Sequence, residues 1–439
     1  MKEKILLLQI AAGGYHFVTR NLGGQKLGPL TVKPLKALFP ALTCVVQATM
    51  RTASPPVRHG IVANGFFFKE QWKPLFWEQS SRLVQGPRIW ERFRSCGGTV
   101  AQMFIQQSLG LDSDLLLSPA PIHKHHGGMI LDCFSTPPAL NKRLRMEIGT
   151  VFPLHRYWGP AASQKSSQWI TRAVVNVMEQ DRPGFLFAYL PHLDYALQRS
   201  GPGSSKSARA FTELNKCLQV LIQSAKKEQY RIILFGDYPI GDAHEVIFPN
   251  KILRSAGLFS TRNVKGKLYP DYYTSAAFCI VDHQIAHLHL FEPDLPESGR
   301  LISGRPEEVK ALMLNLPGVD RVLDRAAQAE AGIDHPRSGE LVLVAKPGCW
   351  FDYRWWDEKN EAPDFASHVD IHNKPGYDPC ELLMGWPPFS VSQNPRKIKG
   401  THGRVDENDP VFYASDLELP GHPESLLELA KSIKEYLDR

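Results

Sequence analysis

The strongest constraint on the fold is an alternation of short, mainly apolar segments with longer helical patterns. Ile5–Ile10, Phe185–Leu190 and Arg231–Phe235 are three such segments, each bounded by glycine, proline or charged residues. Apolar runs of this length are typical of strands buried on both faces of a parallel sheet. Helical patterns over Ser166–Gln180 and Ala208–Lys227 precede the second and third segments. This order predicts a doubly wound, mostly parallel α/β sheet.

A different texture marks residues 119–160, where proline, glycine and histidine are dense and periodicity is weak. We expect a loop-rich cap insertion there, inside a single domain that covers residues 1–439. Its histidines, His123, His125 and His126, lack a carboxylate partner at regular spacing and are expected to lie on a surface loop. Leu341–Val344 is expected to form a further strand, and Pro423–Leu437 a terminal amphipathic helix.

Composition limits the possible partners and the compartment. The formal net charge of +6 over 439 residues, with only short basic runs, does not predict a nucleic-acid-binding face. The apolar run at Ile5–Ile10 is too short for a membrane span and lacks a signal peptide's small-residue cleavage site. Seven cysteines without a CxxC pair indicate reduced thiols, so we expect a cytoplasmic protein that contacts neither nucleic acid nor membrane.

Polar residues follow the predicted strands where ligands bind in such sheets. Asp194 follows the second strand and Asp237 the third, at the carboxyl edge of the sheet. Thr43 follows Pro40 at the start of a helical stretch, where free backbone N–H groups and the helix dipole favour an anion. Thr43 therefore suits attack on phosphorus, although an ordinary N-cap threonine explains the local pattern as well.

Two segments together resemble a known family. Phe39-Pro40-Ala41-Leu42-Thr43 is followed about twenty residues on by His59-Gly60-Ile61-Val62-Ala63-Asn64. The pair resembles the type I phosphodiesterase/nucleotide pyrophosphatase family of the alkaline phosphatase superfamily. The resemblance implies that Thr43 is the nucleophile and a metal ligand, and that Asn64 holds a phosphoryl oxygen.

The same resemblance implies metal ligands but also shows departures from the family pattern. Asp194, Asp237 and His402 match family positions that bind two zinc ions. Gln198 and Tyr238 stand where the family has histidines, and the family's first-strand aspartate is missing, with Ala11 at its aligned position. Glutamine is a poor zinc ligand beside imidazole. We therefore expect one or two divalent ions, zinc first, with manganese or iron as alternatives.

Two further segments are rich in metal-ligating residue types. His283, His287 and His289 would share one face of an extended strand, or His283 and His287 one face of a helix. Asp370 and His372 would project together from a strand. His283, His287, Asp370 and His372 are additional candidate metal ligands; the alternative is that some of these side chains are core groups or support other ligands.

The expected activity is hydrolysis of phosphate diesters or pyrophosphates through a phospho-threonine at Thr43, on a small phosphorylated substrate. A phosphonate, a lipid-linked phosphate or a sulfate ester remains open as substrate, because a fold does not determine its substrate. The substituted ligands leave a second class open, a non-catalytic relative that binds a phosphorylated ligand. Aromatic residues between Phe66 and Trp77 would form either a stacking wall for a leaving group or part of the core.

Overall fold

The computed structural model describes residues 3–125, 128–291 and 306–439. Its largest element is an eight-stranded sheet in the order β11-β8-β7-β12-β1-β13-β24-β4. The five strands from β8 to β13 in this order run parallel, and β11, β24 and β4 pair antiparallel at the edges. The strands are β1 (Lys4–Ile10), β4 (Lys33–Leu35), β7 (Val100–Met103), β8 (Leu115–Pro119), β11 (Cys133–Thr136), β12 (Phe185–Leu190), β13 (Tyr230–Gly236) and β24 (Val411–Ser415).

The predicted doubly wound, mostly parallel α/β sheet is confirmed. Strand β1 lies in its middle, paired with β12 on one side and β13 on the other, and Ile5–Ile10 are all buried. The three apolar segments of the sequence are these three neighbouring strands, whose side chains are covered on both faces. Their carboxyl ends therefore meet at one edge, which is where Asp194 and Asp237 follow.

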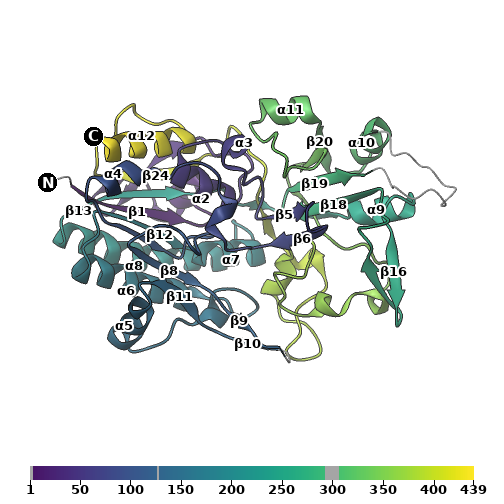
Figure 1. Cartoon of the computed structure of the whole chain (residues 1–439), viewed down its shortest axis with the longest axis horizontal. Helices are drawn as coiled ribbons and strands as arrows, with labels where there is room; N and C mark the ends of the chain where they lie inside the picture. Colours follow the sequence, from purple (N-terminus) through teal and green to yellow (C-terminus); the bar gives the residue numbers. More distant parts are fainter. Residues whose placement is uncertain (1–2, 126–127, 292–305) are drawn as a thin grey trace.

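Helices cover both faces of this sheet (Figure 1). One face carries α1 (Tyr15–Leu22), α5 (Ala139–Ile148), α6 (Gln164–Gln180), α7 (His192–Ser200) and α8 (Ser205–Lys227). The other carries α2 (Thr43–Thr52), α4 (Glu91–Ser95) and α12 (Leu426–Asp438). The predicted helices at 166–180, 208–227 and 423–437 correspond to α6, α8 and α12.

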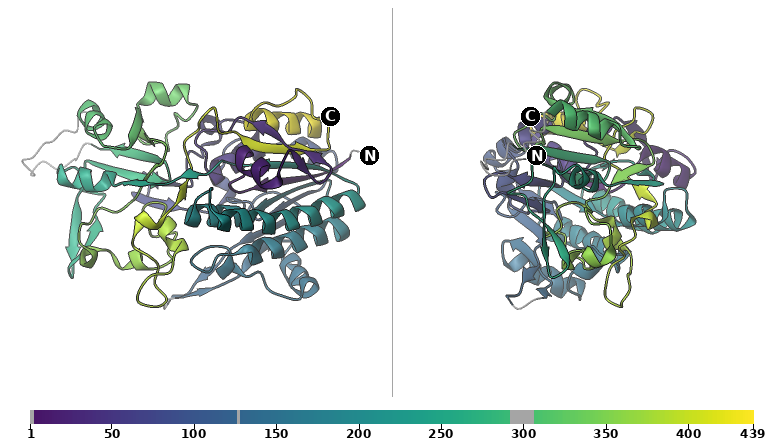
Figure 2. Two further views of the ribbon diagram at one scale, coloured as in Figure 1. Left: turned by 180° about the vertical axis from the view of Figure 1, so that it is seen from behind. Right: turned by 90° about the vertical axis from the view of Figure 1, so that its right-hand side faces the viewer.

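A second, antiparallel sheet lies beyond the large one, and the two chain termini lie at the opposite end of the molecule (Figures 1 and 2). Its strand order is β18-β19-β21-β20. The predicted strand at 341–344 is β21, which is therefore confirmed as a strand but belongs to this smaller sheet. The elements are β18 (Ala277–Asp282), β19 (Ile285–Leu290), β20 (Val319–Leu323), β21 (Leu341–Ala345), α9 (Pro249–Ser255), α10 (Pro306–Leu314), α11 (Arg325–Glu330) and the hairpins β5 (Gly65–Phe68)–β6 (Lys73–Phe76) and β16 (Thr261–Val264)–β17 (Lys267–Pro270).

Residues 119–160, predicted as a cap insertion, contribute both to the large sheet and to a separate hairpin. Strand β11 extends the large sheet, and α5 packs Leu140 and Leu144 into its core. The short hairpin of β9 (Ile122–His123) and β10 (Met129–Ile130) instead projects from the sheet and carries exposed apolar side chains. His126 lies outside the described residues. The division into one domain with a cap insertion stays a prediction.

The remaining elements are short. They are β2 (Lys26–Leu27), β3 (Leu30–Thr31), β14 (Gly241–Asp242), β15 (Glu245–Ile247), β22 (Cys349–Phe351), β23 (Gly400–Thr401), α3 (Pro56–His59) and the 3-10 helices η1 (Ser81–Leu83), η2 (Leu154–Arg156), η3 (Lys359–Glu361), η4 (Asp364–Ser367), η5 (Pro379–Leu382) and η6 (Pro395–Lys397). Across the described ranges, no helix is long and apolar enough to cross a lipid bilayer.

Candidate active site

The candidate residues from distant parts of the sequence meet at the carboxyl edge of the large sheet. Thr43 is the first residue of α2, Asp194 lies in the first turn of α7, and His402 follows β23. All three line a cavity of about 730 Å³. Asp237 directly follows β13 and is completely buried. The N-cap of α2 is Leu42, so Thr43 is not the capping residue that the sequence left as an alternative.

Thr43 is joined to Asp194 through the hydroxyl of Tyr238. Thr43 Oγ1 lies 3.1 Å from Tyr238 Oη, and this hydroxyl donates to Asp194 Oδ1 over 3.2 Å. Because the tyrosine proton is directed to the carboxylate, the Thr43 hydroxyl is the donor to Tyr238. Burial raises the pKa of Asp194 to about 6, against the hydrogen bonds from Gln198 and Tyr238 that lower it. The nucleophile candidate thus has a continuous hydrogen-bonded route to a carboxylate.

Four rings contact one another in series at the site. The Tyr238 and His402 rings lie 3.6 Å apart between centroids, His402 and His283 lie 3.8 Å apart, and His283 and Tyr377 lie 3.6 Å apart. His402 Nδ1 donates to the carbonyl of Ala41 over 2.7 Å, which leaves Nε2 facing Asp194 Oδ1 at 3.9 Å. Burial lowers the pKa of His402 well below its usual value, so the ring is neutral at pH 7.

Asp237 is held by donors from its own chain. Its Oδ2 accepts from Gln9 Nε2 over 3.0 Å, and its Oδ1 accepts the backbone N–H groups of Ala12 and Tyr238 over 2.9 Å each. Burial raises the pKa of Asp237 well above its usual value, although these hydrogen bonds oppose the rise. Gln9 was not among the site residues predicted from the sequence. Its position on β1, directly beside β13, could have pointed to it.

Asn64 lies beside the first turn of α2, which begins with Thr43, but both ends of its amide are engaged. Asn64 Oδ1 accepts the backbone N–H of Cys44 over 3.0 Å, and Nδ2 donates to Asp282 Oδ1 over 3.1 Å. Asp282 also accepts the backbone N–H of Asn64 over 2.7 Å and contacts His283 Nδ1 at 2.7 Å. Asp282, at the end of β18, was missed by the sequence reasoning. It holds Asn64 against the first turn of α2, so the second sheet positions this residue.

The additional metal-ligand candidates do not come together. His283 lies in the turn between β18 and β19 with a positive φ of 58°, so the prediction that it shares a strand face with His287 and His289 was wrong. His287 and His289 do share one face of β19, but neither lines the cavity. His287 Nδ1 accepts the backbone N–H of Gly339 over 3.2 Å.

Asp370 and His372 line the far wall of the cavity, and the prediction that they project from a strand was wrong because they lie in a turn. Asp370 Oδ2 accepts from Asn373 Nδ2 over 2.8 Å, and its other oxygen accepts further bonds from the same residue. His372 Nδ1 donates to the carbonyl of Phe76 over 3.1 Å, and its ring meets that of His123 edge to face.

The donors present do not fit the two-zinc site that the resemblance implied. A zinc site needs at least three protein ligands within reach of one ion. Among the residues that the structure describes, no group of three histidine, cysteine, aspartate or glutamate side chains is arranged to hold a metal ion. Asp194 and His402 remain as a pair, while the oxygens of Asp237 already accept three N–H groups.

The walls of the cavity are mostly apolar or aromatic. Within the described chain no lysine or arginine lines it, and its carboxylates are those of Asp194 and Asp370. Of the aromatic stretch between Phe66 and Trp77, only Trp77 reaches the cavity, whereas Phe66, Phe67 and Phe76 are buried in hydrophobic clusters. Most of that stretch is therefore core. The apolar wall comes from other segments, including Tyr157, Trp158, Val369 and the β9–β10 hairpin.

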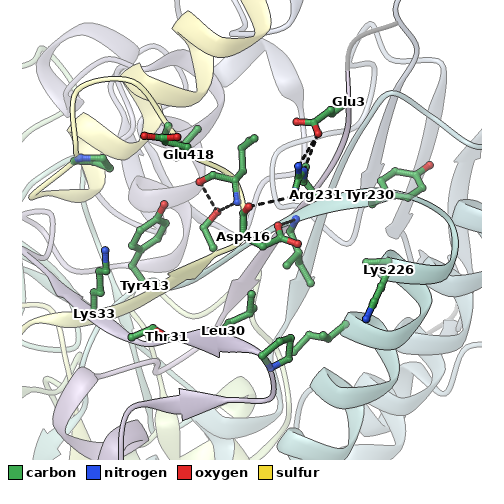
Figure 3. Close-up of a pocket in the computed structure, with 18 of the residues that line it drawn as sticks. Glu3, Leu30, Thr31, Lys33, Lys226, Tyr230, Arg231, Tyr413, Asp416 and Glu418 are labelled. Atoms are coloured by element: carbon green, nitrogen blue, oxygen red, sulfur yellow. Dashed lines mark hydrogen bonds and ion pairs between the residues drawn. The ribbon is translucent and has the colours of Figure 1, made fainter.

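A larger cavity of about 980 Å³ lies at the opposite, amino-terminal edge of the large sheet. Figure 3 shows Arg231 at the start of β13 in an ion pair with Glu3, with Asp416 close by. Lys33 and Lys226 face this cavity together with Glu418, so its charges are mixed. None of the candidate catalytic residues lines it, and we assign it no part in the chemistry.

Comparison with known proteins places the chain in a family. Residues 30–378 match the profile of the type I phosphodiesterase/nucleotide pyrophosphatase family. The chain belongs to this family. As a member of the type I phosphodiesterase/nucleotide pyrophosphatase family it is a hydrolase. No curated protein matches its sequence.

Solved structures share the fold of this family member at low sequence identity. Phosphonoacetate hydrolase from Sinorhizobium meliloti 1021, in complex with phosphonoformate, is 15% identical with a TM-score of 0.60, over 98% of this chain and 96% of that chain. Murine and human ectonucleotide pyrophosphatase/phosphodiesterase 5 are each 15% identical, with TM-scores of 0.61 and 0.62, over 99% of this chain and 95% of theirs. These likenesses support the alkaline phosphatase type of fold.

Proposed function

We propose that this protein hydrolyses a phosphate diester or a pyrophosphate, with Thr43 as the nucleophile. The observation that carries the proposal is the hydrogen-bonded series Thr43–Tyr238–Asp194 at the floor of the cavity, with Thr43 in the first turn of α2. Thr43 Oγ1 attacks phosphorus and the alcohol or phosphate leaving group departs. The threonine proton passes to the Tyr238 oxygen as the tyrosine proton passes to Asp194. Water then hydrolyses the phospho-threonine: its hydroxyl binds to phosphorus, its proton goes to the departed leaving group, and Asp194 returns its proton through Tyr238 to the Thr43 oxygen.

Of these two substrate classes the cavity favours the phosphate diester, with little negative charge and an apolar or flat group. A phosphate monoester carries close to two negative charges, which such sites usually meet with arginine, lysine or metal ions. The described lining has neither arginine nor lysine, whereas Trp77, Trp158 and Tyr195 offer broad apolar surfaces. A diester carries a single negative charge, and backbone N–H groups in the first turn of α2 can stabilise such a charge.

Relatives and composition add indirect support. The Sinorhizobium enzyme has been solved with phosphonoformate, and an inactive form of murine ectonucleotide pyrophosphatase/phosphodiesterase 5 with AMP, so a small phosphorylated ligand suits this fold. All seven cysteines are unpaired, which supports the proposed cytoplasmic location. The resemblance implies a metal-dependent enzyme. The proposed steps involve no metal ion, because the donor side chains of the described residues do not form a metal site.

The test compares wild type, Thr43→Ala and Thr43→Ser on bis(p-nitrophenyl) phosphate and on p-nitrophenyl phosphate, with and without chelator. We expect turnover of the diester above that of the monoester, a loss on the order of 100-fold or more in Thr43→Ala, and partial activity in Thr43→Ser. Acid quenching and mass spectrometry should find phosphate ester on Thr43. Binding of the diester without turnover in all three proteins would instead support a non-catalytic relative.

A further inference from the structure

Two histidines that bind metal in the family are replaced by other residues in this chain. Tyr238 stands at one family histidine position and Gln198 at the other. Neither points away from the site. Tyr238 Oη contacts both Thr43 and Asp194, and Gln198 Nε2 donates to Asp194 Oδ2 over 2.7 Å. Both oxygens of Asp194 are therefore occupied by donors from the protein.

A metal ion bridging Thr43 and Asp194 is incompatible with Tyr238 in this position. Zinc binds oxygen ligands at about 2 Å, so an ion bound to both residues must lie between them. The Tyr238 hydroxyl, 3.1 Å from one and 3.2 Å from the other, already occupies that place. It cannot swing aside freely, because its ring is stacked on His402 and completely buried.

Gln198 and Gln9 also make contacts where the family has metal ions. Gln198 is also fixed at its other end, where Oε1 accepts from Tyr377 Oη over 2.8 Å, and Tyr377 in turn stacks on His283. Gln9 Nε2 donates to Asp237 in the same way as Gln198 donates to Asp194. Each carboxylate of the family's metal site thus receives an N–H from a neutral glutamine amide.

We propose that Tyr238, Gln198 and Gln9 take the place of the family's metal ions, so that this site holds its nucleophile and its two carboxylates without zinc. The proposal relies on the proposed function only for the identity of the site. Tyr238 orients Thr43 and connects it to Asp194, and the glutamines keep Asp194 and Asp237 in place. The histidine substitutions at 198 and 238 are the changes that should restore metal binding.

The test measures zinc and manganese binding without any substrate, so its result is separate from that of the hydrolysis assay. Wild type and Gln198→His/Tyr238→His are dialysed against chelator, titrated with each ion against a chromophoric chelator, and assayed for metal content. The control, Gln25→His/Tyr273→His, carries the same two substitutions on exposed residues. We expect weak zinc binding by wild type and control, and a gain on the order of 100-fold in the double variant, lost again on adding His402→Ala.

Two results would overturn the proposal. One is tight zinc binding by wild type that disappears in His402→Ala, which would show that the wild-type site holds a metal ion. The other is a folded double variant, judged by circular dichroism, with no gain in affinity. If the double variant does not fold, the comparison of wild type with His402→Ala decides alone.

Discussion

The ring of Tyr238 lies flat against the ring of His402, with centroids 3.6 Å apart and planes 4° from parallel. Tyr238 lies just after strand β13 and His402 just after β23, 164 positions later in the chain. This contact joins the hydrogen-bonding partner of Thr43 to His402. It gives Tyr238 two separable roles, since the ring packs and the hydroxyl bridges Thr43 to Asp194.

Tyr238→Phe separates these roles. The ring stack should survive, while Asp194 Oδ1 and Thr43 lose a buried hydrogen-bonding partner, at a cost of about 1–2 kcal/mol in the free energy of unfolding. Tyr238→Leu loses the stack as well and should cost more. Urea unfolding of both variants at pH 7 checks the order. Equal losses in the two variants would show that the ring contributes nothing beyond its hydroxyl.

Asp282 should make stability depend on pH. Burial raises the pKa of Asp282 to about 6, against the lowering effect of the Asn64 backbone hydrogen bond and of His402. Because the folded pKa exceeds the unfolded value of about 4, the folded state binds more protons in this window, and stability falls as pH rises from about 4 to 6. The loss amounts to at most about 3 kcal/mol.

Asp282→Asn removes that titration. The free energy of unfolding of the variant, relative to wild type at the same pH, should therefore improve by up to about 3 kcal/mol between pH 4 and pH 7. Denaturant unfolding at four or five pH values measures this, and the comparison at each pH cancels the other titrating groups. A difference that stays constant over the range would contradict the assigned shift.

A buried ionic network supports the cavity wall that contains Asp370. Lys374 Nζ lies 2.8 Å from Asp378 Oδ2 and 2.8 Å from Glu381 Oε1, and Glu381 Oε1 also accepts the backbone N–H of Asp370. Lys374→Met would leave both carboxylates without this cation in the interior, at a cost of about 3–5 kcal/mol. The exposed Lys359→Met should change stability by less than about 0.5 kcal/mol. Thermal and denaturant unfolding compare the two.

The strand end before Asp237 leaves no room for a side chain. A Cβ on Gly236 would lie 1.9 Å from the carbonyl oxygen of Gly13, whereas a Cβ on Gly241 would meet no atom within 4 Å. Gly236→Ala should therefore lose more than about 3 kcal/mol of stability or fail to fold, while Gly241→Ala stays within about 0.5 kcal/mol. Soluble yield and unfolding of this matched pair provide the measurement, and similar stabilities would contradict the close backbone approach.

Local pattern was sufficient for the elements whose neighbours bury them completely. Ile5–Ile10 and Phe185–Leu190 could be recognised as strands because a strand covered on both faces needs an unbroken apolar run. The same pattern located Asp194 and Asp237, since the carboxyl ends of parallel strands meet at one edge. The placing of His283, Asp370 and His372 on strands was wrong, because turn geometry depends on contacts from elsewhere in the chain.

The sequence by itself determined the layered α/β fold, the family and the position of Thr43 at a helix start, because strand burial, helix starts and motif spacing are local properties. Only the tertiary structure decided what surrounds Thr43. Gln9, Asp282 and Tyr377 come from three separate strands or loops, and each reaches the site through side-chain hydrogen bonds to residues distant in the sequence. Such contacts depend on how β1, β18 and the loop before η5 pack together, which no spacing along the chain encodes.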